Sequence, residues 1–425
     1  MPFRLIFFFT LLTPLLGIVQ VEAGAFAPNV NVWGAPNGAT YAFIAYAIFA
    51  LVGVWATAGV TFFRGPGIRP PPPVRAARRL VAQYNTLAVA VSGCLCALML
   101  LVFGGLTVLS GDVSKGEFRT SLGGLGALAY LTLKWLGPCI FAFGCALYVF
   151  AGKPRFARKS LLVVGLLTFV IGISWGFKGS ALLITAPGIA ILLWFARLRS
   201  LVPWALAGIG SLLLAFNLFD TLDNSVYESA VQFLIARLTI FQGDVSWYIW
   251  DLWRSGEPLP DYWTTPLVAV GDRLFSVITG ITRDDAELWV TSHYGSLLTY
   301  TVGYPIEGIE AGHSVTGTPF SEALFALGIA GIPVFGLLAG IVTGVVYKRI
   351  ARAMAEGRPM SAALWSNYFV WFVFAWLNAG DMAQLFHVSA IIGAVAAKLM
   401  LSFMAGLLRL APSSPPDTLQ SVRTP

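Results

Sequence analysis

The sequence predicts an all-α polytopic membrane protein with about ten transmembrane helices, and three observations predict it. Hydrophobic residues make up 57% of the chain and charged residues only 11%. The mean hydropathy of +0.77 is too high for an ordinary water-soluble domain. Apolar runs long enough to cross a bilayer, which takes about 20 residues per helix, recur along the chain. They cover residues 5–21, 41–63, 85–109, 122–150, 160–175, 180–196, 201–219, 321–347, 361–378 and 384–409.

The first run has two readings. Arg4 precedes an apolar stretch that leads into the small residues of VEAGAFA. This order fits either a transmembrane helix or a cleaved signal peptide. Both readings place residue 40 on the outer side of the membrane.

Basic residues cluster in alternate connections between the runs, near positions 64–79, 153–159, 197–199 and 348–358. Lys and Arg accumulate in short cytoplasmic loops, so these connections are expected to face the cytoplasm. The net charge of +7 is therefore a topology signal and not a sign of nucleic-acid binding. The linker 64–79 holds four consecutive prolines, which favour an extended chain beside anionic headgroups.

The runs divide the chain into four parts. Residues 1–219 form the N-terminal transmembrane helices, 321–411 the C-terminal ones, and 412–425 a cytoplasmic tail. Residues 220–320 form one large outer loop, which carries most of the polar and aromatic variety. Long ordered loops of this kind are usually functional.

The four cysteines, Cys94, Cys96, Cys139 and Cys145, all fall within predicted spans. No histidine or carboxylate stands beside them at the spacing of a metal site. We interpret them as small apolar residues, so no structural metal is implied.

Lys178 lies at the tip of a tight outer hairpin, in SWGFKGS between two apolar runs. The positive-inside bias argues against a basic residue there. One reading is that its ammonium snorkels to headgroups or water. The other is that the flanking glycines let the ammonium approach a lipid-linked phosphate.

Arg237 falls in the middle of an apolar helix face. The capping pattern at 225–228 predicts a helix that ends near Gly243. A buried guanidinium needs a partner. One possible partner is a carboxylate of the loop, Asp244 or Asp251. The other is a substrate phosphate, which the planar guanidinium group can contact through two N–H groups. Arg119, Arg273 and Arg283 are further outward cations, each by itself typical of a surface charge. Lys134, inside a span, is a functional candidate by its position.

Three histidines are the candidates for proton transfer: His293, His313 and His387. His313 and Glu310 stand between glycines just before a helix predicted to begin near Pro319. A histidine satisfied by a backbone carbonyl is the competing reading. Further along this helix, glycines at 336, 340 and 344 predict close helix packing.

The segments FRTSLGGLG, GFKGS, ARLTIFQGD and GHSVTGTPFSEALFALGIAGIPVFGLLAG together resemble the Wzy-type oligosaccharide repeat-unit polymerases of O-antigen, capsule and exopolysaccharide synthesis. The resemblance covers roughly residues 85–405 and rests mainly on topology. It implies a C-type glycosyltransferase of the bacterial inner membrane with its active side in the periplasm. Such an enzyme transfers a glycan from undecaprenyl pyrophosphate onto the next lipid-linked repeat unit.

The resemblance also implies roles for particular residues. Lys178, Arg237, Arg119 and Arg273 would hold the pyrophosphate, and His313 or Glu310 would act as the base for the acceptor hydroxyl. Neither a metal nor a nucleotide sugar is implied. The implied partners are the lipid-linked oligosaccharide, membrane lipid, a flippase and a chain-length regulator.

Two other functions stay open: an O-antigen ligase, which uses the lipid A core as acceptor, and a flippase or transporter of lipid-linked oligosaccharide. Transporters commonly place charged sites in repeated halves, whereas this chain shows no repeat. Six aromatic residues of the large loop either stack on sugars or form an interfacial belt. They are Trp247, Tyr248, Trp250, Trp253, Tyr262 and Trp263.

Overall fold

The computed structural model describes most of the chain, and all structural statements below refer to that part. Within it, only the backbone is described at residues 64, 75–79, 109, 178–179, 230 and 408–410. The described residues are 2–64, 75–110, 118, 122, 125–175, 178–196, 230–310 and 313–410.

The protein is an all-α multi-pass membrane protein. In its described part, eight helices are long and apolar enough to cross a bilayer, in agreement with eight of the ten predicted runs. The run 180–196 forms a shorter apolar helix, Ser180–Leu192, and the run 201–219 lies outside the described residues. The eight spans are Pro2–Glu22, Ala39–Ala58, Leu80–Val102, Gly126–Phe150, Arg155–Ile173, Pro319–Ala355, Pro359–Ala379 and Val388–Leu407.

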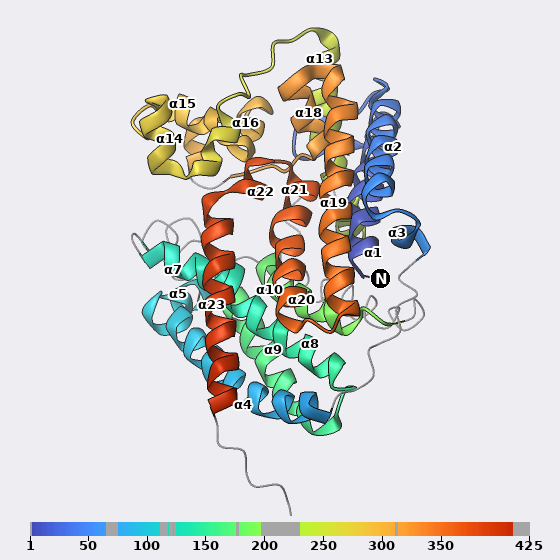
Figure 1. Ribbon diagram of the computed structural model, residues 1–425. Helices are drawn as coiled ribbons and strands as arrows, with labels where there is room; N and C mark the ends of the chain where they lie inside the picture. The colour runs from blue at the N-terminus through green and yellow to red at the C-terminus, as the bar shows by residue number, and fades with distance from the viewer. Residues whose placement is uncertain are drawn as a thin grey trace, which may run out of the picture.

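Helices from the two ends of the sequence, blue and orange, pack along one another at the right of the view (Figure 1). The N-terminal elements are α1 (Pro2–Glu22), β1 (Phe26–Ala27), β2 (Val32–Trp33), α2 (Ala39–Ala58) and α3 (Val60–Arg64). The C-terminal ones are α18 (Pro319–Leu327), η6 (Gly328–Ala330), α19 (Gly331–Ala355), α20 (Pro359–Tyr368), η7 (Phe369–Phe374), α21 (Ala375–Ala379), α22 (Ala383–Phe386) and α23 (Val388–Leu410).

The α2–α19 pair confirms the close packing predicted from the glycine spacing. A Cβ built on Gly340 would lie 2.0 Å from the carbonyl oxygen of Ala50, and one on Gly336 would lie 2.6 Å from that of Tyr46. A Cβ on Gly344 would meet the Thr57 hydroxyl. The two backbones therefore lie in close contact along about two helical turns.

A second bundle forms beside this pair from α4 (Arg75–Ala97), η1 (Leu98–Val102), α5 (Gly105–Ser110), α7 (Gly126–Leu131), η3 (Thr132–Leu136), α8 (Gly137–Phe150), η4 (Arg155–Ala157), α9 (Arg158–Ile173) and α10 (Lys178–Leu192). The predicted α9–α10 hairpin is present. It closes where the Ser180 hydroxyl donates a 2.6 Å hydrogen bond to the carbonyl of Gly172. Three π-helical segments, η1, η3 and η7, interrupt the long helices of the protein.

The helix predicted to run from near 225 to Gly243 is instead two helices, α12 (Ala230–Leu238) and α13 (Ile240–Ser255). Residues 225–228, the predicted cap, lie outside the described part. The chain turns at Thr239 because α1 passes close by. A Cβ on Gly17 would meet the Thr239 carbonyl oxygen, and one on Gly243 would lie 2.5 Å from the Pro14 carbonyl oxygen. The start of the predicted outer loop is thus packed against the first transmembrane helix.

The α1–α2 connection is held by side chains from α13. Asp244 accepts hydrogen bonds from the backbone and side-chain nitrogens of Asn29, both 2.9 Å long. Further along, Arg254 and Trp250 donate to the carbonyl of Asn37 at 2.6 and 3.0 Å. The first helix is therefore an integral part of the folded bundle.

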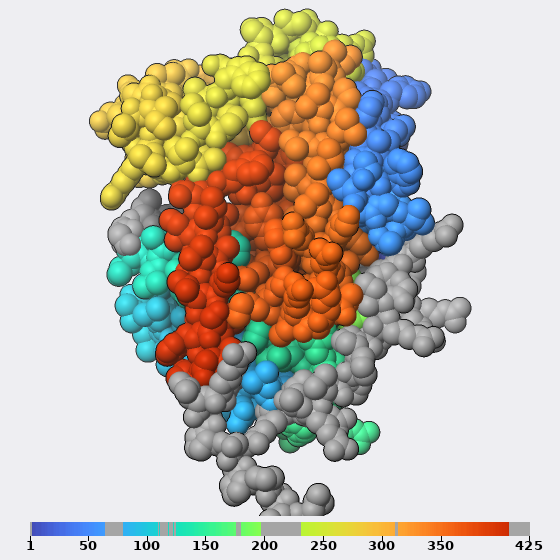
Figure 2. All heavy atoms as spheres, in the orientation of Figure 1, coloured from blue at the N-terminus to red at the C-terminus, as the bar shows by residue number. Residues whose placement is uncertain are grey.

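A small helical lobe sits at one end of the bundle, over α22 and the start of α23 (Figures 1 and 2). We use "the lobe" for residues 262–310. It contains η5 (Thr265–Val270), α14 (Asp272–Thr279), α15 (Ala286–Ser292), α16 (Tyr294–Thr301) and α17 (Ile306–Glu310).

Candidate functional site

A cationic pocket opens on the surface of the lobe. It has a volume of 360 Å³ and is lined by Asp272, Arg273, Ser276, Arg283 and Trp289. The guanidinium of Arg283 lies 3.5 Å from the Asp272 carboxylate and 5.4 Å from the centre of the Trp289 ring system. Two arginines and one carboxylate give the pocket a net positive charge, which suits an anionic ligand.

His293 supports the wall of this pocket. Its Nδ1 lies 2.9 Å from the carbonyl of Trp289, so Nδ1 carries a proton and Nε2 faces Asp272 at 3.9 Å. Burial opposes a charge on His293, but the hydrogen bonds to Asp272 and to the Trp289 carbonyl outweigh it and raise the pKa of His293. The hydrogen bond from His293 lowers the pKa of Asp272.

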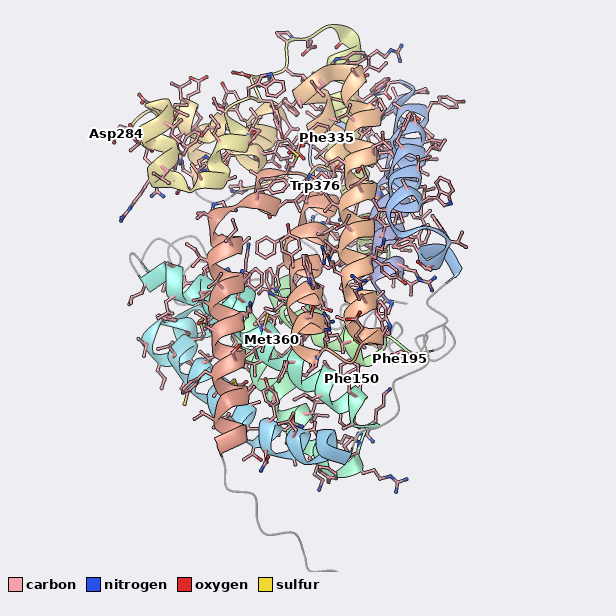
Figure 3. The ribbon with its side chains drawn as sticks, viewed as in Figure 1. Phe150, Phe195, Asp284, Phe335, Met360 and Trp376 are labelled. Carbon is pink, nitrogen blue, oxygen red and sulfur yellow. The ribbon has the colours of Figure 1, made fainter. Side chains whose placement is uncertain are left out.

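A buried carboxylate joins the lobe to the transmembrane helices. Glu322 of α18 is fully buried and accepts a 2.6 Å hydrogen bond from the Tyr262 hydroxyl at the start of the lobe. Its carboxylate also accepts hydrogen bonds from Nε1 of Trp376 at 2.8 Å and from the backbone nitrogen of Met382 at 2.6 Å. Trp376 lies just beneath the lobe in Figure 3. Three separate parts of the chain thus meet at one side chain.

Asp381 lies beside this junction in a strained backbone conformation, with φ of +71°. Its carboxylate accepts a 3.0 Å hydrogen bond from Gln384. Burial raises its pKa, against that hydrogen bond and the positive charges of His293 and Lys134. The preceding Gly380 also has a positive φ, and a Cβ there would lie 2.4 Å from the Tyr294 ring.

Lys134, in η3, was predicted as a functional candidate inside a span or as a residue near the outer interface, and its charge acts on Asp381 and His387. Its ammonium lies 4.2 Å from the centre of the Tyr130 ring and 5.6 Å from that of Trp371. Lys134 therefore adds a cation to the underside of the junction.

His387 stands at the start of α23, immediately before the span in which it was predicted. The backbone nitrogen of Ser389 donates to His387 Nδ1 at 3.2 Å, which leaves the proton of the neutral ring on Nε2. Burial and the charge of Lys134 lower the pKa of His387. The ring is therefore neutral at pH 7 and presents an N–H donor.

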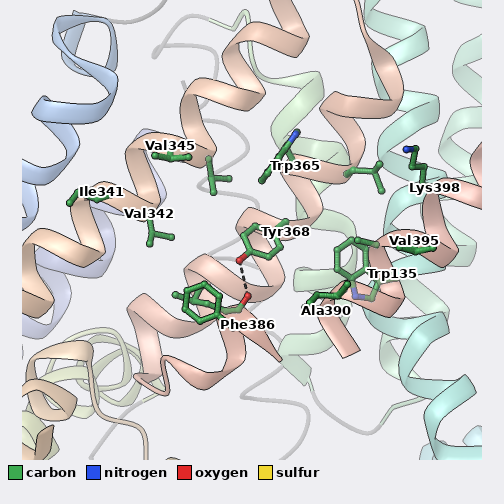
Figure 4. A pocket seen from close by; sticks show the side chains of 15 residues that line it. Trp135, Ile341, Val342, Val345, Trp365, Tyr368, Phe386, Ala390, Val395 and Lys398 are labelled. Atoms are coloured by element: carbon green, nitrogen blue, oxygen red, sulfur yellow. Dashed lines mark hydrogen bonds between the residues drawn. The ribbon is translucent and has the colours of Figure 1, made fainter. Parts of the chain in front are cut away.

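An apolar groove of 690 Å³ runs along the membrane helices below His387, between α19, α20 and α23 (Figure 4). Leu385 and Phe386 line one end of the groove, and Trp365 and Lys398 line the other. The hydroxyl of Tyr368 donates a 2.8 Å hydrogen bond to the Leu385 carbonyl, which fixes the first end (Figure 4). The remaining lining residues are Trp135, Ile341, Val342, Val345, Val346, Leu364, Ala390, Ile391, Ala394 and Val395.

The groove and the cationic pocket share no lining residue, but the segments that line them come close where Gly271 approaches Val388. A Cβ on Gly271, the residue before α14, would lie 3.3 Å from Cγ1 of Val388, the first residue of α23. Asp272 and Arg273 follow directly on one side of this contact, and His387 and Phe386 precede it on the other. An apolar channel and a cationic head site are therefore adjacent.

The predicted base candidates lie away from the cationic pocket, Glu310 at the end of the lobe and His313 just after it. His313 and Glu310 are both exposed. The His313 ring stacks on Tyr304, with 6.1 Å between ring centres. Its backbone nitrogen donates to the carbonyl of Gly308 at 3.0 Å. Neither residue lines the pocket of Arg273.

Arg237 has an exposed side chain that stacks on Phe241, with its guanidinium carbon 4.7 Å from the ring centre. The carboxylates proposed as ion-pair partners, Asp244 and Asp251, bind Asn29 and Asn37 instead. Burial raises the pKa of Asp244 to about 6. In the described part of the chain no ion pair joins Arg237 to either acid.

Two predicted phosphate ligands cannot be placed. Arg119 lies outside the described residues, and Lys178 is the first residue of α10 with a side chain outside the described part. Of the six loop aromatics, Trp247 and Tyr262 are buried, and their polar atoms bond to Ala35 and Glu322. These two pack inside the protein, and sugar stacking by them is excluded in this conformation. Trp263, in contrast, is exposed.

Sequence reasoning missed Glu322 and Asp381. Glu322 lies in the first turn of α18, where an acidic residue is common. A sequence signal existed for both: each carboxylate stands at the edge of an apolar run, where an unpartnered charge is costly. Arg283 was recognised only as a surface charge.

Comparison with known proteins gives no relative for this site: no protein-family model, no curated protein and no solved structure matches the chain.

Proposed function

We propose that the protein is a membrane glycosyltransferase that acts on saccharides carried by polyprenyl pyrophosphate, and that it polymerises such lipid-linked repeat units. The observation that supports this most is the adjacency of the apolar groove and the cationic pocket at Gly271 and Val388. An isoprenoid tail needs an apolar channel open to lipid. A pyrophosphate needs fixed cations and N–H donors close to where that channel ends.

In this proposal the lobe faces the periplasm of a bacterial inner membrane. Arg273 and Arg283 bind the pyrophosphate, and His387 donates its Nε2 proton to a phosphate oxygen. The neutral state of His387 matters because an N–H donor requires no counter-charge in a partly buried site. Lys178, Arg237 and Arg119 stay further candidates for the same anion.

The reaction is a displacement at the anomeric carbon of the donor sugar. The acceptor hydroxyl of the next repeat unit forms a bond to that carbon, and the bond from the carbon to the pyrophosphate oxygen breaks. The hydroxyl proton passes to His313 or Glu310. The departing pyrophosphate gains negative charge, which Arg273 and Arg283 stabilise in the transition state.

Purified protein in detergent with undecaprenyl-pyrophosphate repeat units, without metal or nucleotide sugar, tests the proposal. A ladder of lengthening lipid-linked glycan is the expected result. Transfer only to a lipid A core acceptor would favour a ligase. Intact substrates, combined with transbilayer movement of the same lipid in proteoliposomes, would favour a flippase and overturn the proposal.

A further inference from the structure

The lobe helix α14 has an apolar face that is exposed and that no described residue of the protein covers. Leu274, Val277 and Ile278 are 57%, 81% and 59% exposed. Their spacing of three and four residues places them on one face of the helix. Phe275, on the opposite face, is fully buried and packs on Trp289 and His293.

This face begins at the membrane boundary of the protein. Gly271, directly before α14, contacts Val388, the residue at which the apolar span of α23 starts. Along α23 most exposed residues are apolar as well, as expected for a lipid-facing helix. The exposed apolar residues of its first three turns are Ile391, Ile392, Val395 and Leu399, and Lys398 is exposed beside them.

The charges next to the apolar face match a membrane surface. Arg273 precedes Leu274 in α14, and Arg283 lies beside it across the cationic pocket. Basic and aromatic residues flanking an apolar helix face are typical of helices that lie in the headgroup region of a bilayer. The lobe also projects sideways beyond α23, so it overhangs the membrane around the bundle (Figure 2).

We infer that α14 is an interfacial helix, with Leu274, Val277 and Ile278 inserted into the outer boundary of the acyl chains. The lipid surface thereby covers the apolar face and fixes the height of the lobe above the membrane. Arg273 and Arg283 are held at the level of lipid phosphates. This inference concerns the bilayer alone and is independent of the proposed reaction.

A fluorescent probe at Val277 tests the inference in the full-length protein. Of the four cysteines Cys94 is the exposed one, so Cys94→Ala removes the background labelling site. Val277→Cys then carries bimane in vesicles of phosphatidylethanolamine and phosphatidylglycerol. The matched control is Asp284→Cys, because Asp284 lies at the outer edge of the lobe and is exposed (Figure 3).

Doxyl-labelled lipid is expected to quench the probe at 277 several-fold more strongly than the probe at 284, and aqueous iodide is expected to do the reverse. Equal quenching of both sites by iodide would overturn the inference, because α14 would then stand in water. Protection of 277 from both quenchers would overturn it in favour of a protein partner. If Val277→Cys fails to accumulate, Leu274→Cys probes the same face.

Discussion

Gly271 and Val388 lie in direct contact, with 3.3 Å between the position of a Cβ on Gly271 and Cγ1 of Val388. Gly271 has φ of +91°, which a residue with a side chain adopts only under strain. This contact joins two parts of the chain more than a hundred residues apart in sequence. It brings the segment that lines the cationic pocket next to the segment that lines the apolar groove.

Replacing either pocket arginine should reduce transfer. Arg273→Ala and Arg283→Ala each remove one fixed cation from the leaving pyrophosphate, and losing one such stabilising group costs about 10²-fold in rate. Arg273→Lys should recover only part of the rate, since lysine keeps the charge but lacks the planar fork. Single-turnover rates with the purified variants measure the effect.

Arg352→Ala is the matched control for these variants. Arg352 is exposed and pairs with Glu356 at the C-terminal end of α19, far from the pocket in the folded protein. Its removal should leave the transfer rate unchanged. Full activity in both pocket variants would exclude the pocket as the pyrophosphate site.

Filling the groove should weaken binding of the lipid tail. Ala394→Trp places an indole in the channel between α19 and α23, so KM for a long-chain substrate should rise about tenfold or more, the equivalent of about 1.4 kcal/mol. An analogue with a short prenyl chain should be affected much less. Leu166→Trp enlarges an exposed side chain on a separate groove along α9, so it should change KM for neither the long-chain nor the short-chain substrate. Equal effects on both substrates would show that the groove does not hold the tail.

Variants of His387 and His313 should distinguish substrate binding from proton transfer. His387→Ala removes an N–H donor and should raise KM, whereas His313→Ala removes a base and should lower kcat by about 10²-fold or more. His387→Asn, which keeps an N–H donor, should recover part of the affinity. A fall in kcat from His387→Ala with no change from His313→Ala would assign the base differently.

Local stability of the lobe should depend on pH through His293 and Asp272. The pKa of His293 is raised by folding, so His293 stabilises the lobe at any pH below its ordinary pKa near 6.5. This stabilisation is lost as the pH rises through the pKa of His293 in the folded protein. The pKa of Asp272 is lowered by folding, so Asp272 stabilises the lobe at any pH above its ordinary pKa near 4. This stabilisation is lost as the pH falls through the pKa of Asp272 in the folded protein. Stability from this pair is therefore greatest between about pH 4 and 6.5.

Hydrogen exchange of α14 and α15, corrected for the intrinsic rate at each pH, measures this dependence. Both side chains are partly exposed, so the change should stay below about 1 kcal/mol. His293→Gln should remove the loss at high pH and also reduce the loss at low pH, because the interaction with His293 is the largest cause of the lowered pKa of Asp272. A flat profile in the native protein would mean that solvent screens the pair.

Local sequence patterns predicted the elements of the fold better than they predicted the junction. The glycines at 336 and 340 indicated helix packing by their spacing alone, and of the ten predicted apolar runs eight are spans in the described part of the chain. The junction at Glu322 depends on Tyr262, sixty residues before it, and on Trp376 and Met382, more than fifty after it. A local pattern of apolar residues cannot predict hydrogen-bond partners that are so distant in the sequence.

The same limit explains the missed break at Thr239 and the missed pairing of the pocket arginines. Thr239 breaks the helix because of Gly17, which lies in a different transmembrane segment. Arg273 and Arg283 line one pocket because α14 and α15 fold against each other. The sequence names Arg273 as a pyrophosphate ligand only through the resemblance and Arg283 only as a further outward cation, and no local pattern predicts that the two share a pocket.

The α2–α19 contact should be sensitive to a single methyl group. Gly340→Ala would place Cβ 2.0 Å from the Ala50 carbonyl oxygen, so two backbones have to separate, and we expect a loss of several kcal/mol. Gly406→Ala is the matched control, because Gly406 is also helical and has no atom within 4 Å of an added Cβ. It should be neutral or stabilise the protein by up to about 1 kcal/mol through helix propensity. Thermal unfolding in detergent measures both variants, and equal melting temperatures would contradict the close packing of α2 on α19.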